Sequence, residues 1–320
     1  MSEKLLVIGG TYFLGKAFVS LMLRETDCEI TIMHRGTSKP SGGSEGDAKA
    51  DAFEDYKKSG RLKEILADRH DGSAIREIRE ERFDAVIDFC AYIKEDISFL
   101  LDRLSATIGR YIFISTVDVY ERGLGRFLNE DAQFETRTIG GAAGDYIAGK
   151  VALEGEIRSA CERKGCTYTV LRPAIIFGPD NYAPREGMYF HWILNAGQIL
   201  HPVDADGEFQ LVYVEDVAKA IKLVLENEKA ANSAYNVCEN KMITYESFAK
   251  CLAEISGTEF TRLDITLDVV NEKGLPLPFP LTKAESNYYD GSRLAELGME
   301  YTDMNSAMKH TYLEYVRRNK

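Results

Sequence analysis

One tyrosine and one lysine in the middle of the chain have the spacing of an acid–base pair. The segment Asp145–Lys150 opens a helical pattern, and a separation of four residues places Tyr146 and Lys150 on one helical face. Because a nearby ammonium group favours the phenolate, we expect the pKa of Tyr146 to fall below its reference of about 10. Tyr146 can then act as general base or acid on a substrate hydroxyl or carbonyl. Taken alone, the motif is also compatible with an exposed helical pair that does no chemistry.

A glycine-rich turn lies near the amino terminus, between the apolar run Lys4–Ile8 and the helical pattern Phe13–Arg24. In that context glycine lets the backbone approach a pyrophosphate, which the helix N-terminus then faces. A plain strand–helix turn is the alternative. Tyr12 stands where a middle glycine is usual, so its ring must turn away from the pyrophosphate or its hydroxyl must donate to it. The turn predicts a dinucleotide site built from Gly9, Thr11, Tyr12, Phe13, Leu14 and Gly15.

The elements that must position these groups alternate between strand and helix patterns over the first 170 residues. Helical periodicity is found at Phe13–Arg24, Ile93–Leu104 and Tyr146–Arg163. The strand-like runs are Lys4–Ile8, Ile30–Met33, Glu64–Ala67, Ala85–Phe89, Tyr111–Ser115 and Tyr168–Arg172. This alternation predicts an α/β fold with a Rossmann-type doubly wound parallel sheet.

The domain organisation follows from a change of pattern after Arg172, where irregular loops and short elements replace the alternation. We expect an NAD(P)-binding domain over residues 1–172 and, mostly, a smaller substrate-binding domain over residues 173–320. One strand and one helix near residues 213–228 are expected to return to the core. The segment Thr37–Asp51, rich in Gly, Ser and Pro, is expected to form an exposed loop.

The composition of the chain makes some classes of binding partner less favoured than others. The chain has 39 Lys plus Arg against 51 Asp plus Glu, a net charge of −12, which disfavours a nucleic-acid partner. Six scattered cysteines show neither a CxxC motif nor zinc spacing, so we expect no metal site and reduced thiols. No apolar run approaches the ~18 residues that a transmembrane helix needs. We expect a cytoplasmic protein that does not enter a membrane.

With the Tyr146–Lys150 pair and the glycine turn, the sequence resembles the extended short-chain dehydrogenase/reductase family, the NAD(P)-dependent nucleotide-sugar epimerases and dehydratases, from about residue 4 to about residue 315. The run Ser115-Thr116 with Tyr120 four residues after Thr116 is similar to the family's strand-end motif. The resemblance makes Thr116 the catalytic hydroxyl, which orients the reacting oxygen for Tyr146, and lets Lys150 also hold the nicotinamide ribose. In isolation, Ser115 and Thr116 could simply close a buried strand.

The choice of nicotinamide cofactor rests on the end of the second strand-like run. A carboxylate there would accept from the ribose 2′-hydroxyl, but the run ends in His34-Arg35-Gly36. Arg35 can pair with a 2′-phosphate, so NADP is favoured over NAD; a solvated Arg35 is the alternative. The resemblance implies an adenine contact from Asp68 and further cofactor contacts from Arg69, Cys90, Ala91, Tyr92, Ser115 and Pro173.

The substrate side is less defined. The segments Phe177–Arg185 and Met188–Trp192 look most like the subgroup that contains the chloroplast stem-loop-binding proteins and their bacterial relatives. Nucleotide-sugar epimerases generally hold the substrate diphosphate with an arginine where this chain has Phe209, and Arg185 could replace it. The candidate substrate contacts are Asp118, Asn181 and Arg185.

The resemblance implies an NAD(P)-dependent epimerase or reductase that acts on a nucleotide-sugar-like small molecule by hydride transfer. Dehydratase chemistry is less favoured, because Val117-Asp118 supplies one carboxylate where the sugar dehydratases have an adjacent pair. Two alternatives stay open. One is an RNA-binding or RNA-processing protein on the same fold, and the other is a non-catalytic regulator that senses NADP. A homodimer is compatible with either reading.

Overall fold

Seven parallel strands form the central sheet of the computed structural model, which describes residues 2–36, 53–123, 127–183 and 185–319. The strand order is β11-β7-β5-β4-β1-β2-β3, so the Rossmann-type doubly wound sheet is confirmed. Each of the six predicted strand runs falls on one of these strands, while the Thr37–Asp51 loop lies outside the described residues. The strands are β1 (Lys4–Ile8), β2 (Glu29–His34), β3 (Leu62–Leu66), β4 (Arg82–Asp88), β5 (Thr107–Ile114), β7 (Thr167–Pro173) and β11 (Ser233–Val237).

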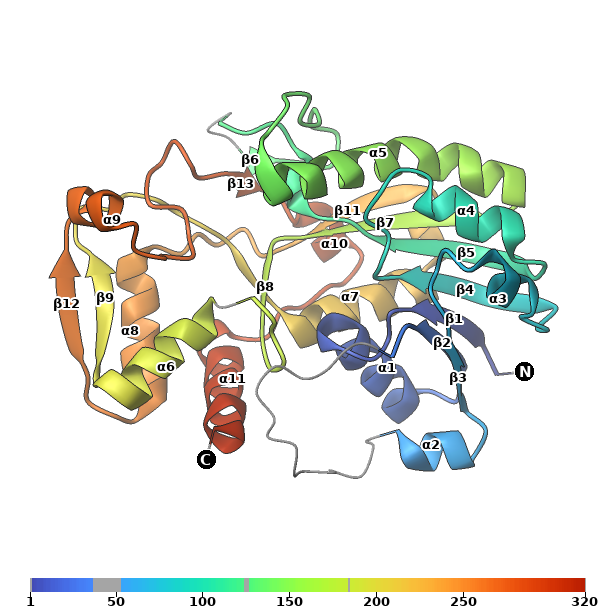
Figure 1. The fold of residues 1–320 in the computed structure, drawn as a ribbon, viewed down its shortest axis with the longest axis horizontal. Coiled ribbons are helices and arrows are strands. Elements are labelled where there is room, and N and C mark those ends of the chain that lie inside the picture. The colour runs from blue at the N-terminus through green and yellow to red at the C-terminus, as the bar shows by residue number, and fades with distance from the viewer. Residues whose placement is uncertain (1, 37–52, 124–126, 184, 320) are drawn as a thin grey trace.

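Helices cover both faces of this sheet (Figure 1). One face carries α1 (Phe13–Glu25) packed against α7 (Val214–Glu226), and the other carries α3 (Gly72–Arg76), α4 (Asp96–Arg103) and α5 (Gly141–Lys164). The short α2 (Glu54–Lys58) leads into β3. Alternate residues of β1 enter separate cores, with Leu5 and Val7 on the α1 side and Leu6 and Ile8 on the α4 side. Both faces of the sheet are therefore covered and buried, which explains the continuous apolar runs in the sequence.

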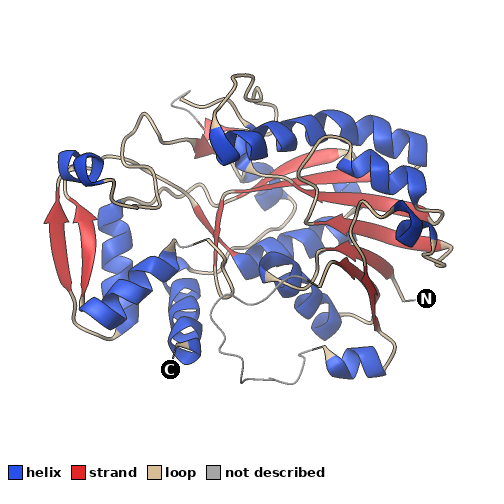
Figure 2. Cartoon of the chain, viewed as in Figure 1, coloured by secondary structure: helices blue, strands red, loops and turns tan. Residues whose placement is uncertain are grey.

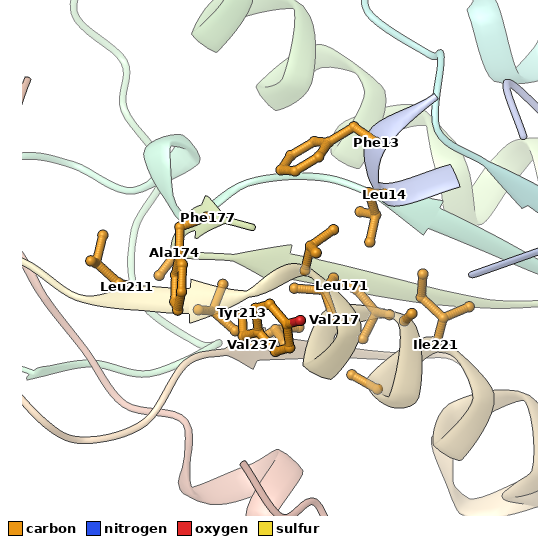
Figure 3. Packing of buried hydrophobic residues seen from close by; sticks show 14 of the residues in the cluster. Phe13, Leu14, Leu171, Ala174, Phe177, Leu211, Tyr213, Val217, Ile221 and Val237 are labelled. Atoms are coloured by element: carbon orange, nitrogen blue, oxygen red, sulfur yellow. The ribbon is translucent and has the colours of Figure 1, made fainter. Parts of the chain in front are cut away.

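The chain returns to the sheet by a different strand from the one expected. The helix α7 does pack on the sheet, and Figure 3 shows its Val217 and Ile221 gathered with Leu171 of β7 and Val237 of β11. However, β10 (Leu211–Tyr213), directly before α7, pairs with β8 (Ile175–Phe177) in a sheet of its own. The strand that joins β7 is β11, which follows α7 and buries Val237 completely.

The remaining elements form a smaller lobe and the connections to it (Figure 2). There β9 pairs in parallel with β12, while β6 and β13 form a short pair nearer the main sheet. The elements are β6 (Phe127–Leu128), α6 (Glu186–Ala196), β9 (Gln198–Pro202), α8 (Tyr245–Ser256), β12 (Thr261–Ile265), α9 (Leu267–Lys273), β13 (Tyr288–Tyr289), α10 (Ser292–Glu296) and α11 (Met304–Arg318). None of the helices in the described ranges is long and apolar enough to cross a membrane.

Candidate active site

A cavity of about 740 Å³ opens at the carboxyl ends of the parallel strands. It lies where the strand order reverses between β1 and β4, the place where open α/β sheets bind ligands. Six strands deliver lining residues to it: Gly9 after β1, Arg35 after β2, Asp68 after β3, Cys90 after β4, Ser115 after β5 and Pro173 at the end of β7. Every residue that the sequence assigned to the site lines this cavity, with the exception of Ala91.

The glycine turn is packed too tightly to accept a side chain at two positions. A Cβ on Gly15 would lie 2.2 Å from the carbonyl oxygen of Gly9. Gly9 has a φ of +89°, and a Cβ there would lie 2.2 Å from Sγ of Cys90. The first turn of α1 contains no acidic residue, so the positive end of the helix dipole faces the cavity unopposed. The turn therefore fits the pyrophosphate of a dinucleotide.

Tyr12, which replaces the middle glycine, lies on the rim of this turn. Its ring centroid is 6.2 Å from that of Tyr182, which arrives from the segment between β8 and α6. Tyr182 also meets Phe13 edge to face, with a centroid distance of 5.7 Å. Tyr182 thus connects the glycine turn, through Tyr12 and Phe13, to the substrate side of the cavity. The sequence did not single out Tyr182, because an aromatic residue in a loop carries no distinctive spacing.

Lys150 lies deep under the cavity, with only 2% of its surface exposed. Its Nζ donates to the carbonyl oxygens of Ala91 and Ile114, each at 2.8 Å, and lies 5.7 Å from the centroid of the Tyr146 ring. Gly149 makes this depth attainable, because a Cβ there would lie 1.9 Å from the carbonyl oxygen of Tyr92. Two of the three ammonium hydrogens are used, which leaves the third for a ligand in the cavity. Ala91 therefore helps to position Lys150 through its carbonyl oxygen, and its predicted cofactor contact stays a prediction.

The expected fall in the pKa of Tyr146 is not found. Burial of the phenol raises its pKa above the ordinary value, the Asp118 carboxylate raises it further, and a hydrogen bond from Thr116 lowers it in part. Burial also lowers the pKa of Lys150 to about 8, although the Asp88 carboxylate opposes this change. The sequence argument placed the ammonium beside the phenol oxygen, whereas the structure directs it to two backbone carbonyls.

Thr116 and Ser115 face different partners. The Thr116 Oγ1 donates to Asp118 at 3.3 Å and accepts from the Asp118 backbone N–H at 3.1 Å, and the Thr116 hydroxyl lowers the pKa of Tyr146. Ser115 instead donates to Glu154 at 2.6 Å, and Glu154 accepts from Nε of Arg172 at 2.8 Å. Thr116 is therefore the hydroxyl placed for chemistry, while Ser115 joins a buried ion pair that holds α5 against β7.

The adenine side has one exposed and one buried arginine. Arg35, 67% exposed, lies 3.8 Å from the Asp68 carboxylate. Arg69 is buried and makes two 2.9 Å bonds to the carboxylate oxygens of Asp88. Cys90 donates its backbone N–H to the same carboxylate at 2.8 Å. Arg69 is thus fixed within the wall, whereas Arg35 can turn towards a bound ligand.

On the substrate side, Asn181 is committed to the protein. Its amide nitrogen donates to the buried Glu186 carboxylate at 3.0 and 3.1 Å. The Arg185 side chain lines the cavity and makes no hydrogen bond or ion pair with any residue that the structure describes. Phe209, which stands in place of the diphosphate arginine, stacks on Phe279 with a centroid distance of 4.2 Å. Of the weak substrate candidates, Arg185 and Asp118 are the ones whose charge faces the cavity.

Comparison with known proteins decides the family. The model of the NAD dependent epimerase/dehydratase family matches residues 5–238, which is most of the chain. The chain belongs to this enzyme family. The chain is 29% identical over 258 residues to the chloroplast stem-loop binding protein of 41 kDa b from Arabidopsis thaliana. The match covers 80% of the chain and 64% of that relative, so the chain spans less than two thirds of its length.

Solved structures of other proteins share the fold of this chain. The UDP-glucose 4-epimerase of Thermotoga maritima, solved with UDP-glucose, has a TM-score of 0.76 at 18% identity, with 99% and 100% of the two chains covered. The UDP-glucuronic acid 4-epimerase of Bacillus cereus, solved with UDP-glucuronic acid and NAD, has a TM-score of 0.74 at 15% identity, with 98% and 99% covered. At such identities the likeness establishes the fold, and the chemistry rests on this chain's own residues.

Proposed function

We propose that the protein catalyses hydride transfer between a nicotinamide dinucleotide and a secondary alcohol or ketone of a sugar-like substrate, with Tyr146 as the acid–base. The observation that carries this proposal is the meeting of Thr116, Tyr146 and Lys150 with the glycine turn in one cavity. An isolated Tyr-x-x-x-Lys motif would have no reason to face a turn that excludes side chains at Gly9 and Gly15.

Each catalytic residue has a distinct task. When bound, the dinucleotide accepts or returns a hydride at the carbinol carbon. In the direction of ketone reduction, the Tyr146 hydroxyl, which its raised pKa keeps protonated, donates its proton to the carbonyl oxygen as the new C–H bond forms, while Thr116 holds that oxygen. In the reverse direction, oxidation of the alcohol needs deprotonated Tyr146 to accept the hydroxyl proton and is therefore favoured by high pH. Lys150 offers its third hydrogen to the ribose. Return of the hydride to the other face of the ketone would give the epimer, and release of the ketone would make the protein a dehydrogenase.

For the cofactor we keep the preference for NADP, supported by Arg35 and by the lack of a carboxylate at the end of β2. A 2′-phosphate would have to draw Arg35 away from Asp68, which lies 3.8 Å from it. With NAD, the same Asp68 carboxylate could accept from a ribose hydroxyl. The cytoplasmic location and the homodimer stay predictions.

A nucleotide-sugar substrate is supported by what the similar solved structures contain, namely UDP-glucose or UDP-glucuronic acid. Phe209 in place of an arginine gives that class weaker support from this chain. RNA binding is the second candidate, favoured by the printed name of the Arabidopsis relative alone. The net charge of −12 and the complete Thr116–Tyr146–Lys150 set place it behind the enzyme.

The test is a Tyr146→Phe variant, which removes the titrating hydroxyl and keeps the ring. With a panel of sugar acids, sugars and sugar nucleotides, we expect turnover to fall by ~10²–10⁴-fold and dinucleotide affinity to stay unchanged. Thr116→Val should lower turnover in the same way. Tyr168→Phe on β7, outside the cavity, is the matched control. Parent-like turnover by Tyr146→Phe, measured by nicotinamide absorbance and by NMR of the product, would refute the assignment.

A further inference from the structure

Beyond Tyr146 the cavity continues along residues from the second half of the chain, which we call the C-terminal wall: Glu208, Phe209, Pro278, Pro280, Glu285 and Tyr289. Asp118, Tyr146 and Tyr289 line the same cavity, and the Asp118 carboxylate raises the pKa of both tyrosines. A substrate held with its reacting carbon at Tyr146 must therefore extend along these residues.

The charge of this wall is negative. Glu208 accepts a 3.0 Å hydrogen bond from the Tyr288 hydroxyl, and Glu285 accepts from the backbone N–H of Leu281 at 2.7 Å. Both partners are neutral, so neither hydrogen bond brings a positive charge to its carboxylate. Among the described residues neither carboxylate forms an ion pair. Hydroxyl groups, which donate hydrogen bonds, suit such a wall, whereas a diphosphate would be repelled.

The two arginines on this side of the cavity, Arg122 and Arg185, differ in whether they form an ion pair. Arg122 is neutralised by Asp118, with an N–O distance of 3.0 Å. Arg185 lines the same cavity as Tyr146 and has no ion pair within the described part of the chain, and its charge lowers the pKa of the phenol. One uncompensated guanidinium beside the reacting centre can accept one planar anion through paired hydrogen bonds. The anion must therefore sit near the reacting carbon and not at the far end of the substrate.

We propose that the substrate is a small polyhydroxylated carboxylic acid of the sugar-acid type, without a nucleoside diphosphate. Arg185 binds its carboxylate, and its hydroxyl groups donate to Glu208 and Glu285. Phe209, which stacks on the buried Phe279, makes this part of the wall apolar where a diphosphate would need cations. This assignment rests on the proposed hydride-transfer function, because it takes Tyr146 as the point at which the substrate reacts.

The experiment is calorimetry on the full chain saturated with NADP⁺, or with NAD⁺ if that binds better. The probes are D-glucuronate, D-galacturonate and D-gluconate, compared with D-glucose and UDP-glucose at one ionic strength. We expect at least one sugar acid to bind more tightly than D-glucose or UDP-glucose. Arg185→Gln should weaken that acid by about tenfold or more, the loss of one charge-assisted contact. Arg185→Lys, which keeps the charge, should recover part of it.

Two controls separate the site from general effects. Arg317→Gln makes the same change of charge on the exposed side of α11 and should leave all affinities unchanged. Dinucleotide affinity in Arg185→Gln should equal that of the parent, which shows that the cavity is intact. Tighter binding of UDP-glucose than of every sugar acid, an Arg185-independent affinity, or no binding of any sugar acid would each overturn the inference.

Two measurements distinguish this failure from failure of the proposed function: nicotinamide absorbance detects net oxidation, and NMR of the sugar acid detects epimerisation. A sugar acid that binds through Arg185 and is never oxidised or epimerised would contradict the hydride-transfer proposal and leave the binding assignment standing. Turnover of UDP-glucose that depends on Tyr146 would support hydride transfer and overturn the sugar-acid assignment.

Discussion

Replacement of Lys150 by Met tests the buried ammonium, the least expected feature of the site. In the parent, burial lowers the pKa of Lys150 from 10.5 to about 8. That change corresponds to an unfavourable contribution of about 3 kcal/mol from keeping the charge in the folded protein at neutral pH. Met removes this contribution and retains the aliphatic volume, but it leaves the carbonyls of Ala91 and Ile114 without a donor, at about 1–3 kcal/mol each. Because these effects oppose each other, we expect Lys150→Met to fold.

The sign of the pH dependence follows from the direction of the pKa change. Between about pH 8 and pH 10.5 the unfolded parent holds a proton on Lys150 that the folded parent has lost. Stability therefore rises with pH in this window by about 1.4 kcal/mol per unit. Relative to pH 7, the parent should gain about 2 kcal/mol by about pH 9.5 from this residue. Lys150→Met lacks this gain.

The assay is urea unfolding of both proteins at about pH 7 and about pH 9.5. The quantity of interest is the difference in free energy of unfolding between the parent and Lys150→Met, and how that difference changes between the two pH values. A difference that stays flat, or that changes in the opposite direction, would show that Lys150 titrates normally and that its burial is misjudged. Calorimetry on the same variant should show dinucleotide affinity reduced by about tenfold, since the third ammonium hydrogen no longer reaches the ribose. Undiminished affinity would refute that part of the assignment.

Three further variants test separate parts of the cavity. Gly15→Ala forces a Cβ to within 2.2 Å of the Gly9 carbonyl oxygen, so dinucleotide affinity should fall by tenfold or more in calorimetry, whereas Gly155→Ala on the open side of α5 should leave it unchanged. Arg35→Ala should weaken NADP about tenfold and NAD hardly at all, and equal losses would argue against the 2′-phosphate contact. Asp118→Asn removes a carboxylate that raises the pKa of Tyr146, so the rise of substrate oxidation with pH should move to lower pH; a rise that stays in place would exclude this coupling.

Local patterns in the sequence predicted the sheet and the residues that line the cavity. Apolar runs, the glycine turn and the Tyr146–Lys150 spacing are short-range signals. The residues that line the cavity lie at or just after the carboxyl ends of the strands, so a predicted strand end also locates them. The returning strand β11 was not identified from the sequence, because another short strand, β10, lies directly before α7. What distinguishes β11 from β10 is its pairing with β7, which is a contact between residues far apart in the sequence.

Electrostatic properties of the site were harder to predict. The spacing of Tyr146 and Lys150 predicted a shared helical face and hence a lowered pKa of the phenol, but the ammonium is directed to backbone carbonyls that precede it by 36 and 59 residues. Likewise, Ser115 and Thr116 are neighbours in sequence, yet one joins the buried Glu154–Arg172 pair and the other faces the phenol. Side-chain direction depends on what the fold brings alongside, which spacing within one element does not contain.

The connection between β8 and α6 ties the two halves of the site together. Its Asp180 accepts from Lys16 of α1 at 3.2 Å and also pairs with Arg318 of α11. Tyr182, two residues on, packs against the rings of Tyr12 and Phe13 on the glycine turn. Arg185 lies at the end of the same short segment. The cation that we assign to the substrate is therefore positioned by contacts with α1 and the glycine turn, which we assign to the dinucleotide. A ligand that orders the glycine turn therefore also orders Arg185, which makes dinucleotide binding first and substrate binding second the expected sequence of events.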